Sequence, residues 1–211
     1  MQSLAIDERM MRHCFTLGTK SAEQGEYPYG AVIVRNGEVV AETTNRVARD
    51  HDVTRHAEVV AISEAQKAIG STSLDDCTIY ANVEPCALCC YAIRESRIGR
   101  VVYAMRSPIM GGASRWNILG DRKLSDMMPE VFAPPPELVP DFMSEEADAA
   151  LQRSSPVTWA FIRTRGLVAS PSQHIPLDLA RQPNGLAGAL DWLMRRLRKN
   201  FFDRFGRGGP S

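Results

Sequence analysis

The side chains best suited to chemistry lie in two short motifs. His56 and Glu58 form an H-x-E pattern, and Cys86 and Cys89 form a P-C-x-x-C pattern. Imidazole and thiolate groups bind Zn²⁺ in proteins, and three such ligands leave one coordination position open, as in catalytic rather than structural zinc sites. We therefore expect His56, Cys86 and Cys89 to bind one Zn²⁺ together with a bound water or hydroxide.

Glu58 lies two residues beyond His56, which limits where the site can be. Residues at i and i+2 are about 200° apart around a helix, so both side chains can serve one site only at the N-terminal end of a helix. There Glu58 would not bind zinc. It would take a proton from the bound water and deliver it to a substrate as general base and acid. The alternative is that Glu58 only interacts favourably with the helix dipole.

The elements before the first motif are expected to be a helix and a hairpin. Apolar spacing predicts an amphipathic helix over 7–24, and the Asn36-Gly37 pair between two β-branched runs predicts a β-hairpin over 30–44. The first run of the hairpin is nearly all apolar, which is typical of a central strand covered on both faces. Asn45 follows the hairpin and either caps a turn or points into the site.

A helix is expected to begin at each motif. The first covers 56–69, with Asp52 and Thr54 as candidate N-caps, and the second covers 85–95, with Pro85 as its first residue. The two motif cysteines in that first turn face the same way, near the positive end of the helix dipole.

Strands and helices alternate along the rest of the chain. We expect strands at 76–83 and 99–104, a helix at 144–152 and a last strand at 157–164. Residues 107–140 are expected to form an irregular excursion, either a functional lid or the cover of a sheet edge. The alternation implies β-α-β crossovers and a three-layer α/β/α sandwich.

The sequence predicts three parts of unequal size. Residues 1–168 form the zinc domain, 169–185 a proline-containing linker, and 186–211 a basic amphipathic helix. From position 171 onward, seven basic residues face three acidic ones, so the tail is +4 and the body before it −4. The tail either packs on the body, contacts an anionic membrane surface or binds a protein partner.

The composition of the whole chain excludes several classes of protein. It has 211 residues, 44% apolar, and a formal net charge of zero, which argues against a large uniform nucleic-acid footprint. Five cysteines, two of them in C-x-x-C, favour metal or thiol chemistry in a reducing compartment. The charged N-terminal segment has no signal-peptide core, and we expect a cytoplasmic protein.

Taken together, the motifs resemble the zinc-dependent cytidine-deaminase-like superfamily, in its guanine deaminase, cytosine deaminase and tRNA adenosine deaminase branch. The resemblance extends from Pro28 to Tyr103 and includes Asn45, Asp52 and Glu84. It implies a five-stranded mixed sheet, hydrolytic release of ammonia with Glu58 as proton carrier, and a homodimer.

The resemblance also implies substrate contacts. Asn45 would hydrogen-bond the base or sugar, and the backbone at Ala31 and Glu84 would shape the pocket. Trp116 either stacks on a base or belongs to the core. Arg55 replaces the small residue usual in the family, and it either contacts a substrate oxygen or an acidic neighbour, or points to solvent.

Three functions are compatible with these residues. We favour deamination of a free nucleobase or related amino-heterocycle, of guanine, cytosine or triazine type, because the body is neutral to acidic and a small neutral base needs no basic surface. The second is conversion of adenosine to inosine in tRNA, for which the tail would have to supply positive charge. The third is a zinc-stabilised, non-catalytic domain whose tail binds a membrane or a partner.

Overall fold

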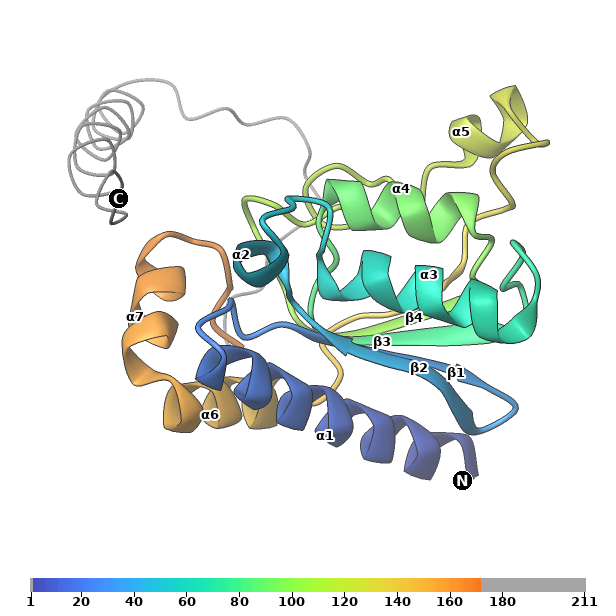
Figure 1. The fold of residues 1–211 in the computed structure, drawn as a ribbon. Helices are drawn as coiled ribbons and strands as arrows, with labels where there is room; N and C mark the ends of the chain where they lie inside the picture. Colours follow the sequence, from blue (N-terminus) through green and yellow to red (C-terminus); the bar gives the residue numbers. More distant parts are fainter. Residues whose placement is uncertain (1, 172–211) are drawn as a thin grey trace, which may run out of the picture. The chain divides into compact units, whose positions relative to one another are not determined.

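The structure of the protein is a computed structural model that describes residues 2–171 (Figure 1). Within them a five-stranded mixed sheet has helices on both faces, as the sequence predicts. The predicted helix 186–211, and nearly all of the predicted linker 169–185, lie outside the described residues, and these two predictions stay untested.

The sheet has the strand order β2-β1-β3-β4-β5. β1 is antiparallel to β2 and β3, whereas β3, β4 and β5 are mutually parallel. The strands are β1 (Gly30–Arg35), β2 (Glu38–Thr44), β3 (Cys77–Val83), β4 (Arg100–Met105) and β5 (Glu137–Val139).

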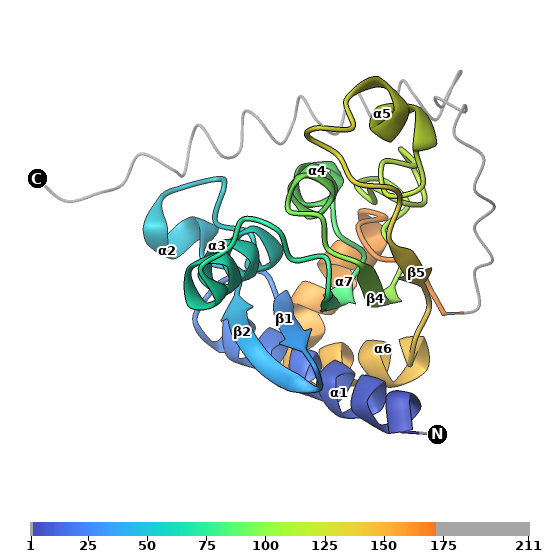
Figure 2. The same cartoon turned by 90° about the vertical axis from the view of Figure 1, so that its right-hand side faces the viewer.

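Helices cover the two faces of this sheet in two layers (Figures 1 and 2). One layer contains α3 and α4, and the opposite layer contains α1, α6 and α7. The helices are α1 (Gln2–Glu23), α2 (Val47–Asp50), α3 (Ala57–Ile69), α4 (Ala87–Glu95), α5 (Arg122–Met127), α6 (Ser144–Ser154) and α7 (Pro156–Thr164).

β1 confirms the expected central strand. Ala31 and Ile33 are buried with the α3 and α4 layer, and Val32 and Val34 are buried with α1 and α6. Side chains alternate between the two faces of a strand, so an apolar run is stable only where both faces are covered.

The Asn36-Gly37 turn confirms the predicted hairpin. Asn36 has φ of 53° and Gly37 has φ of 82°, and Arg35 pairs with Glu38. Two central residues with positive φ are the requirement of a type I′ turn, which asparagine and glycine tolerate best.

The predicted last strand at 157–164 is wrong, because these residues form α7. Pro156 is the first residue of that helix, and Ile162 is its one fully buried side chain, while Val157 and Phe161 are exposed. The β-branched and aromatic composition of this segment therefore led to the wrong prediction. In a strand every second side chain would be buried on one face, and these residues show no such alternation. The fifth strand is instead β5, a three-residue strand within the segment predicted to be irregular.

No helix within residues 2–171 has both the length and the apolar character needed to cross a membrane.

Candidate metal centre and active site

His56, Cys86 and Cys89 come together as the sequence predicts. His56 Nδ1 lies 3.4 Å from each of the two sulfurs, and the sulfurs lie 3.5 Å apart. Ligands at zinc bond lengths of about 2.0–2.3 Å in a tetrahedron are separated by roughly 3.5 Å. The three side chains therefore fit one Zn²⁺ and leave its fourth position open.

Each motif lies at the N-terminus of a helix. His56 is the N-cap of α3, with φ −65° and ψ 146°, and Cys86 is the N-cap of α4, with φ −70° and ψ 174°. Both residues therefore have extended backbone, and the first free N–H groups of both helices face the same region. This geometry lets residues from one helix start serve one site, as we expected for His56 and Glu58.

Two details of the predicted helix starts are wrong. Neither Asp52 nor Thr54 caps α3; Asp52 Oδ1 instead accepts from the backbone N–H and hydroxyl of Thr54, and so shapes the loop before His56. Pro85 precedes the N-cap of α4 and is not its first helical residue. In both cases the ligand itself is the N-cap, because its side chain must point away from the helix to reach the other motif.

The ligand side chains influence one another's charge. Contact with the Cys89 thiol and the His56 imidazole lowers the pKa of Cys86, although burial opposes this. The hydrogen bond with Cys86 raises the pKa of His56. A thiolate at position 86 is the form that binds a metal ion.

Glu58 lies in the first turn of α3 and is buried, with 8% of its surface exposed. Burial, followed by the negative charge at Cys86, raises the pKa of Glu58 to about 7. Among the described residues, its carboxylate is not part of the ligand group, whose atoms lie within 4.8 Å of one another. A carboxyl group with this pKa can accept and donate a proton near neutral pH.

Cys90 is separate from the ligand group, as its position in the helix predicts. It is fully buried, and its thiol donates to the carbonyl of Pro85 at 3.3 Å. Burial raises the pKa of Cys90 well above its ordinary value, so this thiol stays protonated.

Asn45 lies at the end of β2, and its side chain is fixed. Its backbone N–H donates to the carbonyl of Tyr29 at 3.0 Å, and its Nδ2 donates to Glu26 at 2.9 Å. Asn45 is 3% exposed. The sequence analysis did not identify Glu26 as a partner of Asn45, because Glu26 lies in a loop, where a charged residue normally faces solvent.

Tyr29 is a second residue that the sequence did not single out for the site. Burial, followed by the charges of Tyr27, Glu58 and Cys86, raises the pKa of Tyr29. Its ring stacks on Tyr27, with centroids 5.7 Å apart and planes 8° apart. An aromatic pair before β1 was the signal available in the sequence.

Glu84 uses its side chain to bind the segment that follows β4. Its buried carboxylate accepts from the N–H groups of Ser107, Ala113 and Ser114, and from the Ser114 hydroxyl. This carboxylate is thus saturated with internal donors. The backbone N–H of Glu84 donates to Met105 O at 2.7 Å, which leaves the backbone carbonyl of Glu84 for the predicted contact with a substrate.

The segment 107–116 packs directly on the start of α4. Gly112 donates its N–H to Pro85 O at 2.8 Å, and a Cβ at Gly112 would collide with the Cys90 sulfur. The segment ends at Trp116, which is 54% exposed and has the Arg115 guanidinium 5.0 Å from its ring centroid. Trp116 is therefore not a core residue.

Ala31 and Arg55 complete the predicted set. Ala31 is fully buried in β1, between Thr43 of β2 and Ala81 of β3. Arg55 pairs with Asp52 at 3.1 Å, so of the alternatives for its side chain, contact with an acidic neighbour is the one observed.

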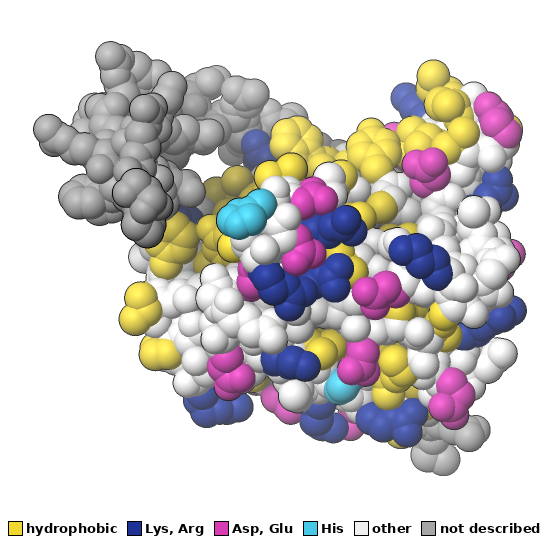
Figure 3. All heavy atoms as spheres, in the orientation of Figure 1, with side chains coloured by type: hydrophobic (Ala, Val, Ile, Leu, Met, Phe, Trp, Pro, Cys, Tyr) yellow, Lys and Arg dark blue, Asp and Glu magenta, His cyan; other side chains and the backbone are white. Residues whose placement is uncertain are grey.

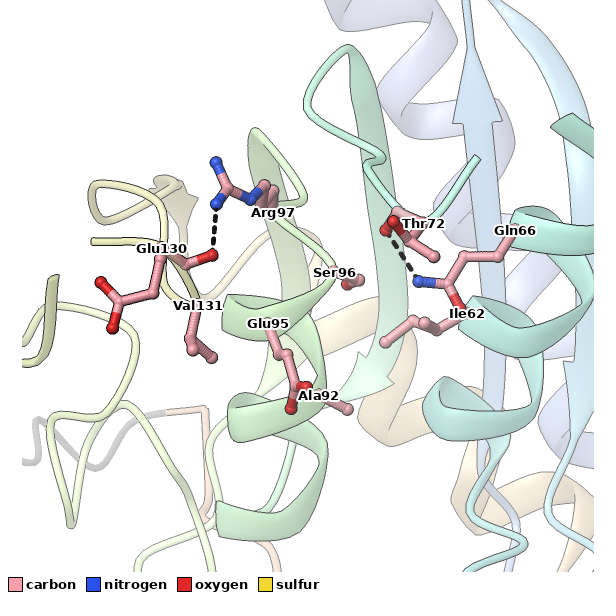
Figure 4. A pocket seen from close by; sticks show the side chains of 9 residues that line it. All are labelled: Ile62, Gln66, Thr72, Ala92, Glu95, Ser96, Arg97, Glu130 and Val131. Atoms are coloured by element: carbon pink, nitrogen blue, oxygen red, sulfur yellow. Dashed lines mark hydrogen bonds between the residues drawn. The ribbon is translucent and has the colours of Figure 1, made fainter. Parts of the chain in front are cut away.

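One groove lies away from the ligand group (Figure 4). It has a volume of about 650 Å³ and lies between the second half of α3 and the C-terminal end of α4. In it Gln66 donates to Thr72 O and Arg97 donates to Glu130 O, so these polar groups already have partners. The ligands lie at the opposite, N-terminal ends of the same two helices.

Known proteins share the segment that contains both motifs. Residues 4–105 match the family model of the cytidine and deoxycytidylate deaminase zinc-binding region. The tRNA-specific adenosine deaminase of Aquifex aeolicus is 38% identical over 107 residues, which are 50% of this chain and 71% of that protein. The guanine deaminase of Bacillus subtilis is 42% identical over 98 residues, 46% of this chain and 63% of that protein.

A longer relative is matched over a smaller share. The chloroplastic tRNA(adenine(34)) deaminase of Arabidopsis thaliana is 36% identical over 111 residues. The match covers 53% of this chain and 8% of that protein. One solved structure comes from studies of A-to-I editing by tRNA:A34 deaminases at the wobble position of transfer RNA. It matches this chain with a TM-score of 0.61 and 28% identity, and the match covers 68% of this chain and 99% of the chain in that structure. The chain thus belongs to the zinc-dependent cytidine-deaminase-like superfamily of hydrolytic deaminases.

Proposed function

We propose that this protein removes the amino group from a free nucleobase or related amino-heterocycle and releases ammonia. His56, Cys86 and Cys89 would hold the metal, since their three donor atoms lie within 4.8 Å of one another. Zinc, when bound, supplies a Lewis acid that lowers the pKa of water toward neutrality.

The chain's own residues would then move protons and position the base. Water adds to the ring carbon that carries the amino group, the C–N bond breaks, and ammonia leaves. Glu58 accepts a proton from the water and returns it to the substrate, for which burial and a pKa of about 7 suit it. Asn45 and the backbone at Ala31 and Glu84 bind the base, and Trp116 covers it.

The charges around the site are the observation that favours a free base. The loop between Asn45 and His56 contains Arg46, Arg49 and Arg55. Arg49 lies 3.2 Å from Asp50, and Arg55 lies 3.1 Å from Asp52. Arg46 lies 3.2 Å from Asp50 and 3.9 Å from Glu64, so three carboxylates face the three arginines. Arginines neutralised in this way offer little to phosphates, whereas RNA binding depends on cations that neutralise them.

Action on adenosine in tRNA is the second candidate, and the relatives favour it. Among them are tRNA-specific adenosine deaminases of Aquifex aeolicus and Bacillus subtilis, 38% and 39% identical in the matched segment. In this case the exposed Trp116 and Arg115 would contact the RNA by stacking and charge.

A zinc-stabilised domain without activity is the third alternative. Such a domain needs neither an open coordination position nor a buried glutamate beside the ligands. A membrane or protein partner for the tail would involve residues outside 2–171, so that proposal has no support from the described structure.

Ammonia release by the zinc-loaded full chain separates these functions. The substrates are guanine, cytosine, adenine, isoguanine and triazines, their nucleosides, and a tRNA anticodon stem-loop that contains adenosine. We expect turnover of at least one free base and none of the stem-loop. Turnover of the stem-loop alone would exclude the free-base proposal, and turnover of none would favour the non-catalytic domain.

We also propose a homodimer that forms through α4. Hydrophobic side chains gather over α4 and α5 along the upper edge of the molecule (Figure 3). Leu88 and Tyr91 of α4 are 45% and 46% exposed, and Met127 of α5 is 79% exposed. An exposed apolar surface of this kind is commonly an interface. Light scattering of the wild type and of Tyr91→Glu tests this: we expect dimer and monomer, respectively.

A further inference from the structure

Glu26 is a buried carboxylate outside the two motifs, and it accepts three hydrogen bonds. It is 8% exposed and lies in the loop between α1 and β1. Its oxygens accept from Asn45 Nδ2 at 2.9 Å, from Ala48 N–H at 3.1 Å and from Arg49 N–H at 2.7 Å. Two of these donors belong to the backbone of α2 and cannot reverse their polarity.

This arrangement determines which way the Asn45 amide points. Its nitrogen and oxygen are alike in shape, but a carboxylate that receives two backbone N–H groups is an acceptor, so the NH₂ group must face Glu26. Asn45 Oδ1 is then directed to the other side. None of the described residues donates a hydrogen bond to this oxygen.

The chain at Asn45 lies beside the segment that carries the first metal ligand. Thr43, two residues earlier, donates its hydroxyl to the carbonyl of Ala57, the residue after His56. Arg46, the residue after Asn45, donates its backbone N–H to the carbonyl of Arg55 at 2.9 Å, directly before His56. Asn45 thus stands between two contacts to the residues around His56, and its Oδ1 is the acceptor that the side chain leaves for a substrate at this site.

We propose that Glu26 is a positioning residue that fixes Asn45 as a hydrogen-bond acceptor, and that the substrate must present an N–H or O–H donor at this point. The inference rests on the proposed function and narrows its substrate class. A free base has a ring N–H that a glycosidic bond removes, as in guanine or cytosine. In a base that is part of a nucleoside, a sugar hydroxyl would have to replace it.

The polarity of the pair can be exchanged without removing the acceptor. In Asn45→Asp, two carboxylates face each other across the 2.9 Å contact. Adding Glu26→Gln supplies an NH₂ group that donates to Asp at position 45 and keeps an oxygen for the Arg49 N–H. The Ala48 N–H, which shares the oxygen that faces Asn45, loses its acceptor in every variant that carries Glu26→Gln. The double variant then has an acceptor toward the substrate and no donor at position 45.

The experiment measures ammonia release and thermal unfolding for the wild type, both single variants and the double variant, with guanine, cytosine and the anticodon stem-loop as substrates. We expect Asn45→Asp to lower kcat/KM by about 100-fold or more, because an acceptor is misplaced and like charges repel. We expect the double variant to recover at least about tenfold of this loss and to regain several degrees of Tm. Asn82→Asp is the matched control, because Asn82 uses both side-chain atoms internally, on Pro28 O and Gly30 N; Glu26→Gln should not rescue it.

Each of the other outcomes would overturn one part of the proposal. If stability recovers in the double variant but activity does not, the substrate takes a hydrogen bond from Asn45 Nδ2 and the donor requirement is wrong. If the losses of the two single variants simply add in the double variant, the Glu26–Asn45 polarity is wrong. If only the anticodon stem-loop is turned over, and the double variant recovers on it, the free-base function fails while the positioning role stands.

Discussion

Glu58 and Glu84 are both buried glutamates, and each lies two residues from a metal ligand in the sequence. The Glu84 carboxylate accepts four hydrogen bonds from residues 107–114. Within residues 2–171, no comparable set of donors from another segment is found for Glu58; burial and the charge at Cys86 raise its pKa to about 7. A carboxylate whose oxygens are taken by donors organises the backbone around it, whereas the desolvated Glu58 carboxyl can exchange protons.

Cys89 and Cys90 repeat the same contrast in adjacent residues. Cys89 contacts Cys86 and His56, whereas Cys90 faces Pro85 O on the inner side of α4. Residue type and burial are alike within each pair. The direction of the side chain relative to the two helix N-termini therefore distinguishes the site from its support.

The largest effect is expected from exchanging the two cysteines separately. Cys89→Ser should reduce zinc far below one per chain and abolish ammonia release, because only two strong ligands remain. Cys90→Ser, the matched control, should keep one zinc per chain and most activity. Metal analysis by mass spectrometry of the purified proteins checks both, and equal zinc loss in the two variants would show that the cysteines do not differ in role.

Glu58→Gln is expected to have the next largest effect. Loss of the proton carrier should lower kcat by about 10²–10⁴-fold, while zinc content stays at one per chain. Ammonia release at saturating substrate, with metal content measured on the same sample, checks this. Retained activity would mean that another group moves the proton.

Glu84→Gln tests the structural partner of this comparison. An NH₂ group in place of one oxygen leaves at least one buried N–H of the 107–114 segment without an acceptor, which costs about 1–3 kcal/mol. We expect a lower free energy of unfolding in urea, with zinc retained. Wild-type stability combined with lost turnover would place Glu84 at the substrate and end the contrast with Glu58.

A smaller, pH-dependent effect is expected at Asp7, another buried carboxylate with internal partners. Burial alone would raise the pKa of Asp7, but hydrogen bonds from Arg100 at 2.8 Å and from Tyr80 at 2.6 Å outweigh it and lower the pKa. A carboxylate with a lowered pKa stabilises the fold above its unfolded pKa of about 3.9. This stabilisation is lost as pH falls through the lower, folded value.

Asp7→Asn should therefore cost about 1 kcal/mol of unfolding free energy at pH 7 and progressively less below about pH 4. Urea unfolding of both proteins from pH 3 to pH 7 measures the difference. A difference that does not change with pH would show that the contact contributes through packing rather than charge.

The sequence predicted the features that rest on local rules. The Asn36-Gly37 turn, the apolar run of β1 and the spacing of Cys86 and Cys89 each depend on a few neighbouring residues. Local geometry limits such segments to few structures, and tertiary contacts do not alter them.

The features that the sequence did not predict depend on distant partners. The side-chain roles of Glu26 and Glu84 follow only from their hydrogen-bond donors, which lie at 45–49 and 107–114. No periodicity in the sequence connects these segments to the two glutamates. The residues of α7 were predicted to form a strand because many of them are β-branched or aromatic. In the structure Val157 and Phe161 are exposed, and the tertiary packing of Ile162 outweighs the strand propensity of the segment. β5 has three residues and directly follows the prolines at 134–136, so it is too short to show a pattern of alternation.

The most direct test of this account compares Glu58→Gln and Glu84→Gln in one series, measuring kcat and the unfolding free energy of each zinc-loaded protein. We expect a crossover, in which Glu58→Gln loses turnover by about 10²-fold or more at unchanged or higher stability. Glu84→Gln should lose about 1–3 kcal/mol of stability and keep most of its turnover. If both variants lose turnover and stability in the same proportion, the division between a proton-carrying and a backbone-organising glutamate is wrong.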